Sequence, residues 1–292
     1  MRGTRGSRSR VPEGREAAMT DVKDSHYVSR FLLRNWEHAA GKLHYFDFGT
    51  GRIHRSSAKS MYTSPTTFPA DVEAWQSRVF ETPLGGYIAR AKVAHARGDA
   101  AAPVPTPSEW RAITVALLAQ PFRTAVARGS RDGQLDLLAS KDERDLDDVV
   151  DAVHQDRRLF VRFGPTERLC FPEAGIAPLP LIGSIRGFFL PLAPTVFAAI
   201  IPREVREESF KDLVHDLPGV ASLLSVGIEG DRVVLPPLSE GADFADVAAR
   251  VRSLREAARR IVEGFHKANK MIERDLGLNL GAMGNEGGEG EL

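Results

Sequence analysis

Five polar residues of the sequence are of the types that hydrolytic and anion-binding sites use: His26, Glu73, Glu81, Gln120 and Arg123. The imidazole of His26 could act as a general base or a metal ligand, because it titrates near neutral pH. A histidine that bonds only to backbone is the alternative. Glu73 and Glu81 are separated by about two helical turns, which puts both roughly on one helix face about 12 Å apart along the axis. Paired carboxylates can divide acid and base roles or bind a divalent cation, although two solvated surface residues fit the same spacing.

Gln120 and Arg123 belong to a helical stripe whose other members are small. Ala116 and Ala119 recur at the same three-to-four-residue spacing, so small side chains flank two long polar ones on one face. Pro121 breaks a local rule, because proline inside a helix removes a hydrogen bond and costs about 3 kcal/mol. Rule-breaking of this kind is expected near functional or strained sites. The alternative is an arginine that extends to solvent from an ordinary packed helix.

Other clusters of reactive residues do not combine into a site. Glu263 and His266 have the spacing of dinuclear iron bundles, but the second copy that such sites need does not occur in the sequence. Cys170, the one cysteine, is expected to be a small buried hydrophobe. Metal ligation is not expected of His38, His44 and His54, because the predicted hairpin does not bring them together. A phosphate-binding strip is less expected than a solvated helix face for five arginines near the end of the chain: Arg250, Arg252, Arg255, Arg259 and Arg260. The sequence contains no phosphate-binding glycine loop, nucleophile elbow or zinc spacing.

The first elements are predicted to be a helix and a hairpin. Ser25 is a good N-cap, and apolar residues follow at helical spacing as far as Trp36, which predicts a short amphipathic helix with His26 at its head. Aromatic and apolar runs on either side of Gly49-Thr50-Gly51 predict a β-hairpin. The Ser/Thr/Pro-rich stretch from residue 60 to 69 is expected to be a loop.

Two longer helices are predicted next. Residues 71–97 have an apolar helical side, but Pro83 and the two glycines after it must kink or split the helix. Thr106-Pro107-Ser108-Glu109 is a capping box with proline at the first helical position. The helix that it opens is expected to end near Arg128, with Gly129 as its C-cap.

The second half of the chain changes character twice. Residues 134–158 predict one or two polar-faced helices, whereas residues 167–201 are rich in proline, glycine and β-branched residues and predict two or three strands. A helix over 203–215 and a short strand over 232–235 follow. Apolar residues then keep a period of about 3.5 from Val247 to Ile272, which predicts one long amphipathic helix packed lengthwise on the body.

Composition is that of an ordinary globular protein. The 292 residues are 42% hydrophobic and 27% charged, which fits one large domain. The formal net charge is zero, so the chain gains no long-range steering toward nucleic acid. No apolar run approaches the roughly 20 residues that span a membrane. The single cysteine favours the cytoplasm over an oxidising compartment.

Both ends are expected to lie outside the fold. Residues 1–23 are predicted to be a disordered basic tail, and Met19 is an alternative to Met1 as the true start. Residues 281–292 are predicted to be a disordered, acidic and glycine-rich tail. Residues 24–280 are then expected to form a single globular domain.

The opening segment carries a family resemblance. The stretch from His26 to Trp36, followed by Gly41-Lys42-Leu43, resembles the His-Tyr-Val-Pro helix and Gly-x-Leu hairpin of an uncharacterised bacterial family, domain of unknown function 4238. The resemblance continues over residues 73–84. It continues again at residues 118–124, similar to the family's Gln-x-x-Arg-Thr segment, and at residues 187–194, similar to its Pro-Leu-Ser-Pro strand. It covers about residues 24–205, and the opening motif is its most specific part.

Two departures from the family pattern bear on function. Ser29 stands where the family has proline, and the region from Phe171 to Pro180, where the family carries Ser-Asp-x-Pro, contains Glu173 but no aspartate. If the family's aspartate is catalytic or binds metal, this chain is diverged or inactive. The resemblance implies that His26, Gln120 and Arg123 form one site, and the family's recurring polar residues are more typical of an enzyme than of a scaffold.

We therefore predict an α+β fold, a predominantly helical single domain with a small antiparallel sheet and a long C-terminal amphipathic helix. The first functional hypothesis is a hydrolase acting on a phosphodiester or nucleotide. In it His26 is base or ligand, Glu73 or Glu81 supports it, and Arg123 stabilises the anionic transition state. The alternative is a non-catalytic binding or regulatory module in which Gln120 and Arg123 hold an anionic ligand or partner. The binding partner that we expect is a nucleotide or a nucleic acid. No membrane partner, cofactor or metal is assigned, and whether the chain is an enzyme stays open.

Overall fold

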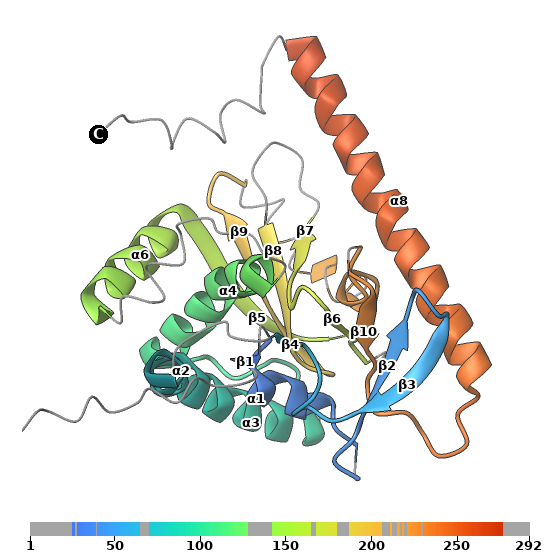
Figure 1. Cartoon of the computed structure of the whole chain (residues 1–292). Coiled ribbons are helices and arrows are strands. Elements are labelled where there is room, and N and C mark those ends of the chain that lie inside the picture. The colour runs from blue at the N-terminus through green and yellow to red at the C-terminus, as the bar shows by residue number, and fades with distance from the viewer. Residues whose placement is uncertain are drawn as a thin grey trace, which may run out of the picture.

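The computed structural model describes residues 25–26, 28–38, 40–64, 70–127, 142–164, 168–179, 187–205, 211, 215–216, 218, 221–228 and 230–276. Their fold is α+β, as predicted (Figure 1). The helices are α1 (Arg30–Leu33), α2 (Ala70–Gln76), α3 (Thr82–Ala96), α4 (Pro107–Ala127), α6 (Glu143–Asp156) and α8 (Phe244–Leu276). A 3-10 turn, Arg34–Trp36, follows α1, and a π-helical turn, Ser77–Glu81, joins α2 to α3.

The described strands form three antiparallel sheets rather than the one small sheet that the sequence predicts. In chain order they are β1 (Ser25–His26), β2 (Leu43–Asp47), β3 (Arg52–Ser56), β4 (Thr63–Ser64), β5 (Arg157–Phe163), β6 (Phe171–Pro172), β7 (Ala177–Leu179), β8 (Gly187–Ala193), β9 (Val196–Pro202) and β10 (Arg232–Val234). The orders are β1-β4, β3-β2-β10-β6 and β5-β9-β8-β7. The predicted hairpin therefore pairs with β10, while most of the strands predicted over 167–201 form a separate sheet.

The sheet β5-β9-β8-β7 lies at the centre of the fold and is buried on both faces. Alternate residues of β9 fall into two hydrophobic clusters, Phe197, Ala199 and Ile201 in one and Ala198 and Ile200 in the other, as the twofold period of a strand requires. The second cluster also contains residues of α3 and α4, which lie over that face (Figure 1). A strand covered on both sides is expected to be continuously apolar, which explains the unbroken run from Val196 to Ile201.

The first predicted helix begins later than expected. Ser25 and His26 form β1 and pair with Ser64 and Thr63 of β4, so the prediction of Ser25 as an N-cap and of His26 at a helix head is wrong. The N-cap of α1 is Ser29, whose backbone is extended at φ −54° and ψ 125°. The competing interaction is a backbone ladder with a segment nearly forty residues away, inside the stretch predicted as loop.

Two further predictions need correction. The polar-faced helix predicted up to residue 158 ends at Asp156 as α6, and β5 starts at once because Arg157–Phe163 pairs along its whole length with β9. The helix predicted over 71–97 is interrupted at the π turn, before Pro83; that proline lies at the start of α3, and the two glycines after it lie within α3. The predicted helix over 203–215 lies mostly outside the described residues, as do Gly129 and both predicted tails.

The long final helix exists, but only its first half packs on the body. Val251 and Ala258 of α8 are buried, and no described residue after Ala258 is. Arg252 and Arg255 of the first half donate hydrogen bonds to the backbone carbonyls of Gly51 and Gly230, and Arg259, where the second half begins, donates to that of Ile228. These arginines therefore anchor the helix rather than form a phosphate-binding strip or a wholly solvated face. Among the described helices, none combines the length and the apolar character that crossing a membrane requires.

Candidate functional site

The predicted site residues belong to elements around one pair of antiparallel helices. Arg90 of α3 forms an ion pair with Glu109 at the start of α4, and the π turn before α3 packs against α4. Counting along both helices from that pair at equal rise places the π turn level with residues 118–122 of α4. Gln120 therefore lies at the level where α2 gives way to α3.

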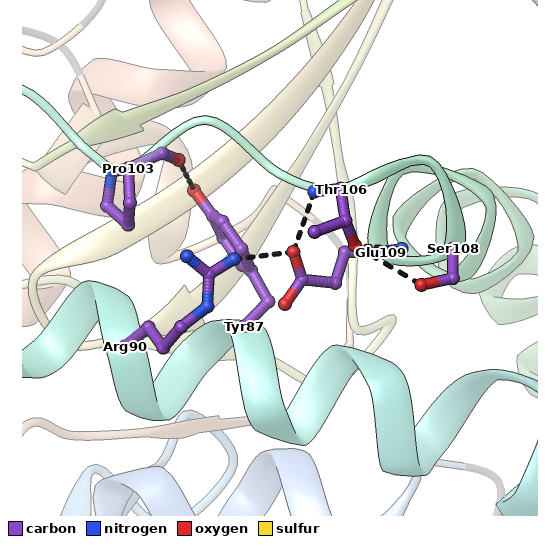
Figure 2. A network of polar contacts seen from close by, with 6 residues as sticks. All are labelled: Tyr87, Arg90, Pro103, Thr106, Ser108 and Glu109. Carbon is purple, nitrogen blue, oxygen red and sulfur yellow. Dashed lines mark hydrogen bonds and ion pairs between the residues drawn. The ribbon is translucent and has the colours of Figure 1, made fainter.

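The end of the pair near the start of α4 is a closed polar network (Figure 2). The carboxylate of Glu109 accepts hydrogen bonds from the backbone N–H of Thr106, at 2.7 Å, and from Arg90, while the hydroxyl of Thr106 accepts from the N–H of Glu109. The buried phenol of Tyr87 donates to the carbonyl of Pro103 at 3.0 Å. This is the predicted capping box, extended by two residues of α3. Its polar atoms have partners within the chain, so it has a structural role.

The pKa of Glu109 follows from this network. Burial alone would raise the pKa of the carboxyl, but the hydrogen bonds from Thr106 and Arg90 outweigh it, and the pKa lies below its ordinary value. The charged form is therefore favoured in the folded state. Burial also raises the pKa of Tyr87, so its hydroxyl stays protonated and remains a donor.

The opposite end of the pair, at the end of α2, differs in kind. Gln76 is 1% exposed, and among the described residues neither atom of its amide has a hydrogen-bonding partner. The indole N–H of Trp75, itself 5% exposed, likewise has no acceptor in the described part of the chain. A buried polar group without a partner costs about 1–3 kcal/mol. Native proteins hold few such groups, and each calls for an explanation such as a ligand or an ordered water.

The backbone next to Gln76 is unusual as well. The π turn Ser77–Glu81 begins directly after it, and single π turns inside helices occur frequently at functional sites. Thr82 closes this turn twice: its backbone N–H and its hydroxyl both donate to the carbonyl of Ser77, the hydroxyl at 3.0 Å. Glu73, one turn before Gln76 on the same face, is half-buried.

Gln120 is held from the side of α4 that faces the strands. Its side chain is 3% exposed and lies over Gly175, in the turn between β6 and β7. A Cβ placed on Gly175 would be 2.5 Å from Cδ of Gln120, and the φ of Gly175 is +75°. The turn therefore requires glycine for its conformation and for the close approach of the glutamine. This turn lies within residues 171–180, the region in which the family that the chain resembles has an aspartate.

Glu173, the one carboxylate in that region, is used elsewhere. Its Oε2 accepts hydrogen bonds from the backbone N–H groups of Asp231 and Arg232, at 2.6 and 3.1 Å. It thus ties the β6–β7 turn to the segment before β10. Glu173 has a structural role in this fold and does not replace the aspartate.

A strained residue marks the N-terminal side of this region. Tyr62 has φ +55°, the one described non-glycine residue with a positive φ, and it directly precedes β4, whose Thr63 pairs with His26. Such strain costs about 1–3 kcal/mol and clusters at functional sites. Tyr62 is fully buried, and its hydroxyl donates to the carbonyl of Arg232 at 3.2 Å.

The predicted site residues are thus placed to different degrees. Glu73 is half-buried on α2, one turn before Gln76, and Gln120 is buried on α4, where it lies over Gly175. Glu81 ends the π turn and is half-buried; the shared face predicted for it and Glu73 assumed a continuous α-helix, which the π turn interrupts. His26 lies on β1 and Arg123 on α4, but both side chains fall outside the described residues.

Trp75 and Gln76 are the residues that the sequence reasoning did not single out. A glutamine and a tryptophan in an amphipathic helix carry no motif, and their burial depends on the packing of α4. The one local signal is the Pro83 region, which predicts a break in this helix but not its position. Reasoning from chemically reactive residue types therefore passed over an amide and an indole.

The histidines near the hairpin form a second polar cluster. The rings of His38 and His44 stack with centroids 4.8 Å apart, and Arg55 Nε donates to Nε2 of His44 at 3.2 Å. Burial lowers the pKa of His44, and the neighbouring His38 and Arg55 lower it further. His44 is therefore neutral near pH 7. Within the described ranges, no three His, Cys, Asp or Glu residues are placed to hold a metal ion.

Burial raises the pKa of the Cys170 thiol to about 12, which fits the predicted inert role.

Comparison with known proteins adds no relative: no family profile matches the chain, and no curated protein or solved structure matches it either. The family resemblance of the opening segment stays a prediction. Any function must therefore be argued from the geometry of the chain itself.

Proposed function

We propose that this protein is a binding module, and that its ligand is held at the end of α2, beside the π turn and α4. The observation that carries the proposal is the buried side chain of Gln76, whose amide has no partner among the described residues and which adjoins the equally unpartnered indole N–H of Trp75. Selection for stability alone would replace such a residue by an apolar one. A ligand that supplies the missing partners gives a reason to keep it.

The available groups point to a ligand class. A glutamine amide offers one donor edge and one acceptor edge, the arrangement that reads the N6/N7 edge of an adenine. The indole of Trp75 adds a further donor. Arg123, on the stripe of α4 that contains Gln120, is the group that we expect to meet a phosphate. A nucleotide satisfies all three groups, and it is the anionic ligand that we infer.

Hydrolysis of the same ligand is the second candidate. It is favoured by one observation, the position of Glu73 on the helix face of Gln76, one turn away. A carboxylate at that distance could orient a water, with His26 as base in the original hypothesis. The lack of an aspartate in the 171–180 region favours binding over catalysis, so hydrolysis ranks second.

A thermal-shift series tests the proposal. Purified protein is titrated with adenine and guanine nucleotides, with inorganic phosphate, and with each in the presence of Mg²⁺. A ligand at one hundred times its Kd stabilises the fold by about 2.7 kcal/mol. We expect an adenine nucleotide to raise Tm in the wild type and in Gln155→Met, an exposed glutamine of α6, but not in Gln76→Met.

The outcomes separate the candidates. A shift that survives in Gln76→Met, or no shift with any nucleotide, contradicts the proposed site. Release of phosphate or nucleoside from a bound nucleotide, lost in Glu73→Gln while the thermal shift remains, moves the assignment from binding to hydrolysis.

A further inference from the structure

Helix α8 has two halves with different surroundings. The first half lies along the hairpin β2–β3, where Arg252 donates to the carbonyl of Gly51, and Arg255 donates to the carbonyl of Gly230, just before β10. The second half, residues 259–276, extends past the other described elements in the upper right of Figure 1. At 1.5 Å per residue this projecting half is about 27 Å long. Helices of such length are marginal in water without packing partners.

The apolar stripe does not stop where the body stops. Val247, Val251, Leu254 and Ala258 continue as Ile261, Phe265, Ala268 and Ile272, with spacings that alternate strictly between four and three residues. That is the 3.5-residue period of a coiled-coil seam. In the projecting half, Ile261, Phe265 and Ala268 of the stripe are only half-buried, and Met271 beside it is 56% exposed. A seam of this kind fits another helix rather than a flat surface.

The projecting half contains a glycine that no described neighbour requires. Gly264 lies in the middle of α8, and a Cβ placed on it would meet nothing within 4 Å. Glycine inside an exposed helix costs about 1 kcal/mol relative to alanine. Because no neighbour in the described part of the chain needs the space, a close approach by a second molecule is the explanation that the geometry favours.

The same stripe is self-complementary when two copies run antiparallel. With the twofold axis between residues 266 and 267, Phe265 of one copy faces Ala268 of the other, twice, so large meets small at the centre. Gly264 lies beside Met271 of the second copy in the same way. The flanking positions are Val262, Gly264, Asn269 and Met271. None is charged, so an identical helix meets no like charge there.

The packing of the first half of α8 favours an antiparallel over a parallel partner helix. The seam of the first half is covered by the chain's own hairpin and turns. In a parallel dimer, the globular parts of the two copies would therefore clash. An antiparallel partner joins only the projecting halves and leaves the bodies at opposite ends. We propose that residues 259–276 of α8 pair antiparallel with the same segment of a second copy, which makes the protein a twofold-symmetric dimer.

Sedimentation equilibrium of the full chain, from about 1 to about 300 µM, tests this proposal. We expect reversible dimers with a dissociation constant on the order of micromolar, because the seam is only about five turns long. Phe265→Glu should weaken the dimer at least about thirtyfold, the loss typical of a central interface residue. His266→Glu introduces the same charge at the next residue, on the exposed face, and should leave the dimer intact.

A side-chain exchange tests the register. Phe265→Ala turns both large–small layers into small–small layers and Ala268→Phe turns both into large–large layers, so each should weaken the dimer. The double variant restores two large–small layers in the antiparallel arrangement only, so we expect its affinity to return to within a few-fold of the wild type. Circular dichroism checks that α8 stays helical in every variant.

Two results would overturn the proposal. One is a monomer throughout the concentration range, in which case the stripe serves something other than a second copy. The other is a dimer that Phe265→Glu leaves unchanged, because the contact would then lie elsewhere on the surface. A dimer that Phe265→Glu breaks but the double exchange does not restore contradicts the antiparallel register.

Discussion

The two ends of the α3–α4 helix pair differ in whether their buried polar groups have hydrogen-bonding partners. Near the start of α4, Tyr87, Arg90, Thr106 and Glu109 satisfy one another and the backbone (Figure 2). At the end of α2, Gln76 and Trp75 are buried just as deeply, yet their polar atoms lack partners in the described part of the chain. Both ends belong to the same layer of helices over the same sheet. The difference teaches that burial of a polar side chain indicates function only when its partners are missing.

The largest expected effect concerns the held side chain of Gln120. Gly175→Ala should lower the free energy of unfolding by about 3 kcal/mol, the sum of a positive φ that costs roughly 1–2 kcal/mol and an overpacked contact that costs about 1–3 kcal/mol. Gly98→Ala is the matched control, since its φ is +82° but a Cβ there meets nothing within 4 Å. Urea unfolding should show a smaller loss for the control. Equal losses would mean that Gln120 is not held against the turn.

Glu109→Gln tests the satisfied end of the pair and should cost about 2 kcal/mol, because the helix cap weakens and a charged hydrogen bond is lost. Arg90 is half-exposed, so its ion pair contributes the smaller share. Glu143→Gln, which removes an exposed ion pair with Arg78 in the first turn of α6, should change stability by less than about 0.5 kcal/mol. If Glu109→Gln lowers the free energy of unfolding no more than the control does, the network does not stabilise the fold.

The stability difference between the wild type and Glu109→Gln is also expected to depend on pH. The pKa of Glu109 is lowered in the folded state, so its stabilisation is complete above the unfolded pKa of about 4.3 and is lost as the pH falls through the lower folded pKa. The difference in stability between wild type and Glu109→Gln should therefore be constant near neutral pH and shrink in acid. A difference that grows in acid would show that the sign of the pKa shift is wrong.

Tyr87→Phe is expected to cost about 1 kcal/mol, because it leaves the carbonyl of Pro103 without its buried donor. Tyr45→Phe, on a half-buried ring that stacks on His54, is the control and should be close to neutral. Thermal unfolding by calorimetry separates the two. If both variants unfold at the wild-type temperature, the hydrogen bond to Pro103 does not stabilise the fold.

Local patterns in the sequence predicted the local parts of the structure. The capping box at Thr106 and Glu109 is confirmed because its partners lie three residues apart, and the final helix is confirmed because an apolar period over many turns has no other solution. The strand β9 follows from its unbroken apolar run. In each case the information that determines the element lies within the element.

The parts that could not be predicted depend on contacts between distant segments. β1 forms because His26 pairs with Thr63, and the π turn lies where the chain packs against α4. The end of packing along α8 depends on how far the body reaches, which a period does not encode. For the candidate site, the sequence pointed to Gln120 and Glu73, but the isolation of Gln76 became visible only once its surroundings were known.

The most direct test of the central claim is the free energy of unfolding of Gln76→Met, measured in urea without ligand. Methionine fills a similar volume without polar atoms, so if the amide lies unsatisfied in the absence of ligand, the variant should be about 1 kcal/mol more stable than the wild type. Exposed Gln155→Met should be neutral. A loss of 1 kcal/mol or more in Gln76→Met would show, within the error of that method, that the amide already has its partners, and the contrast between the two ends of the helix pair would fall.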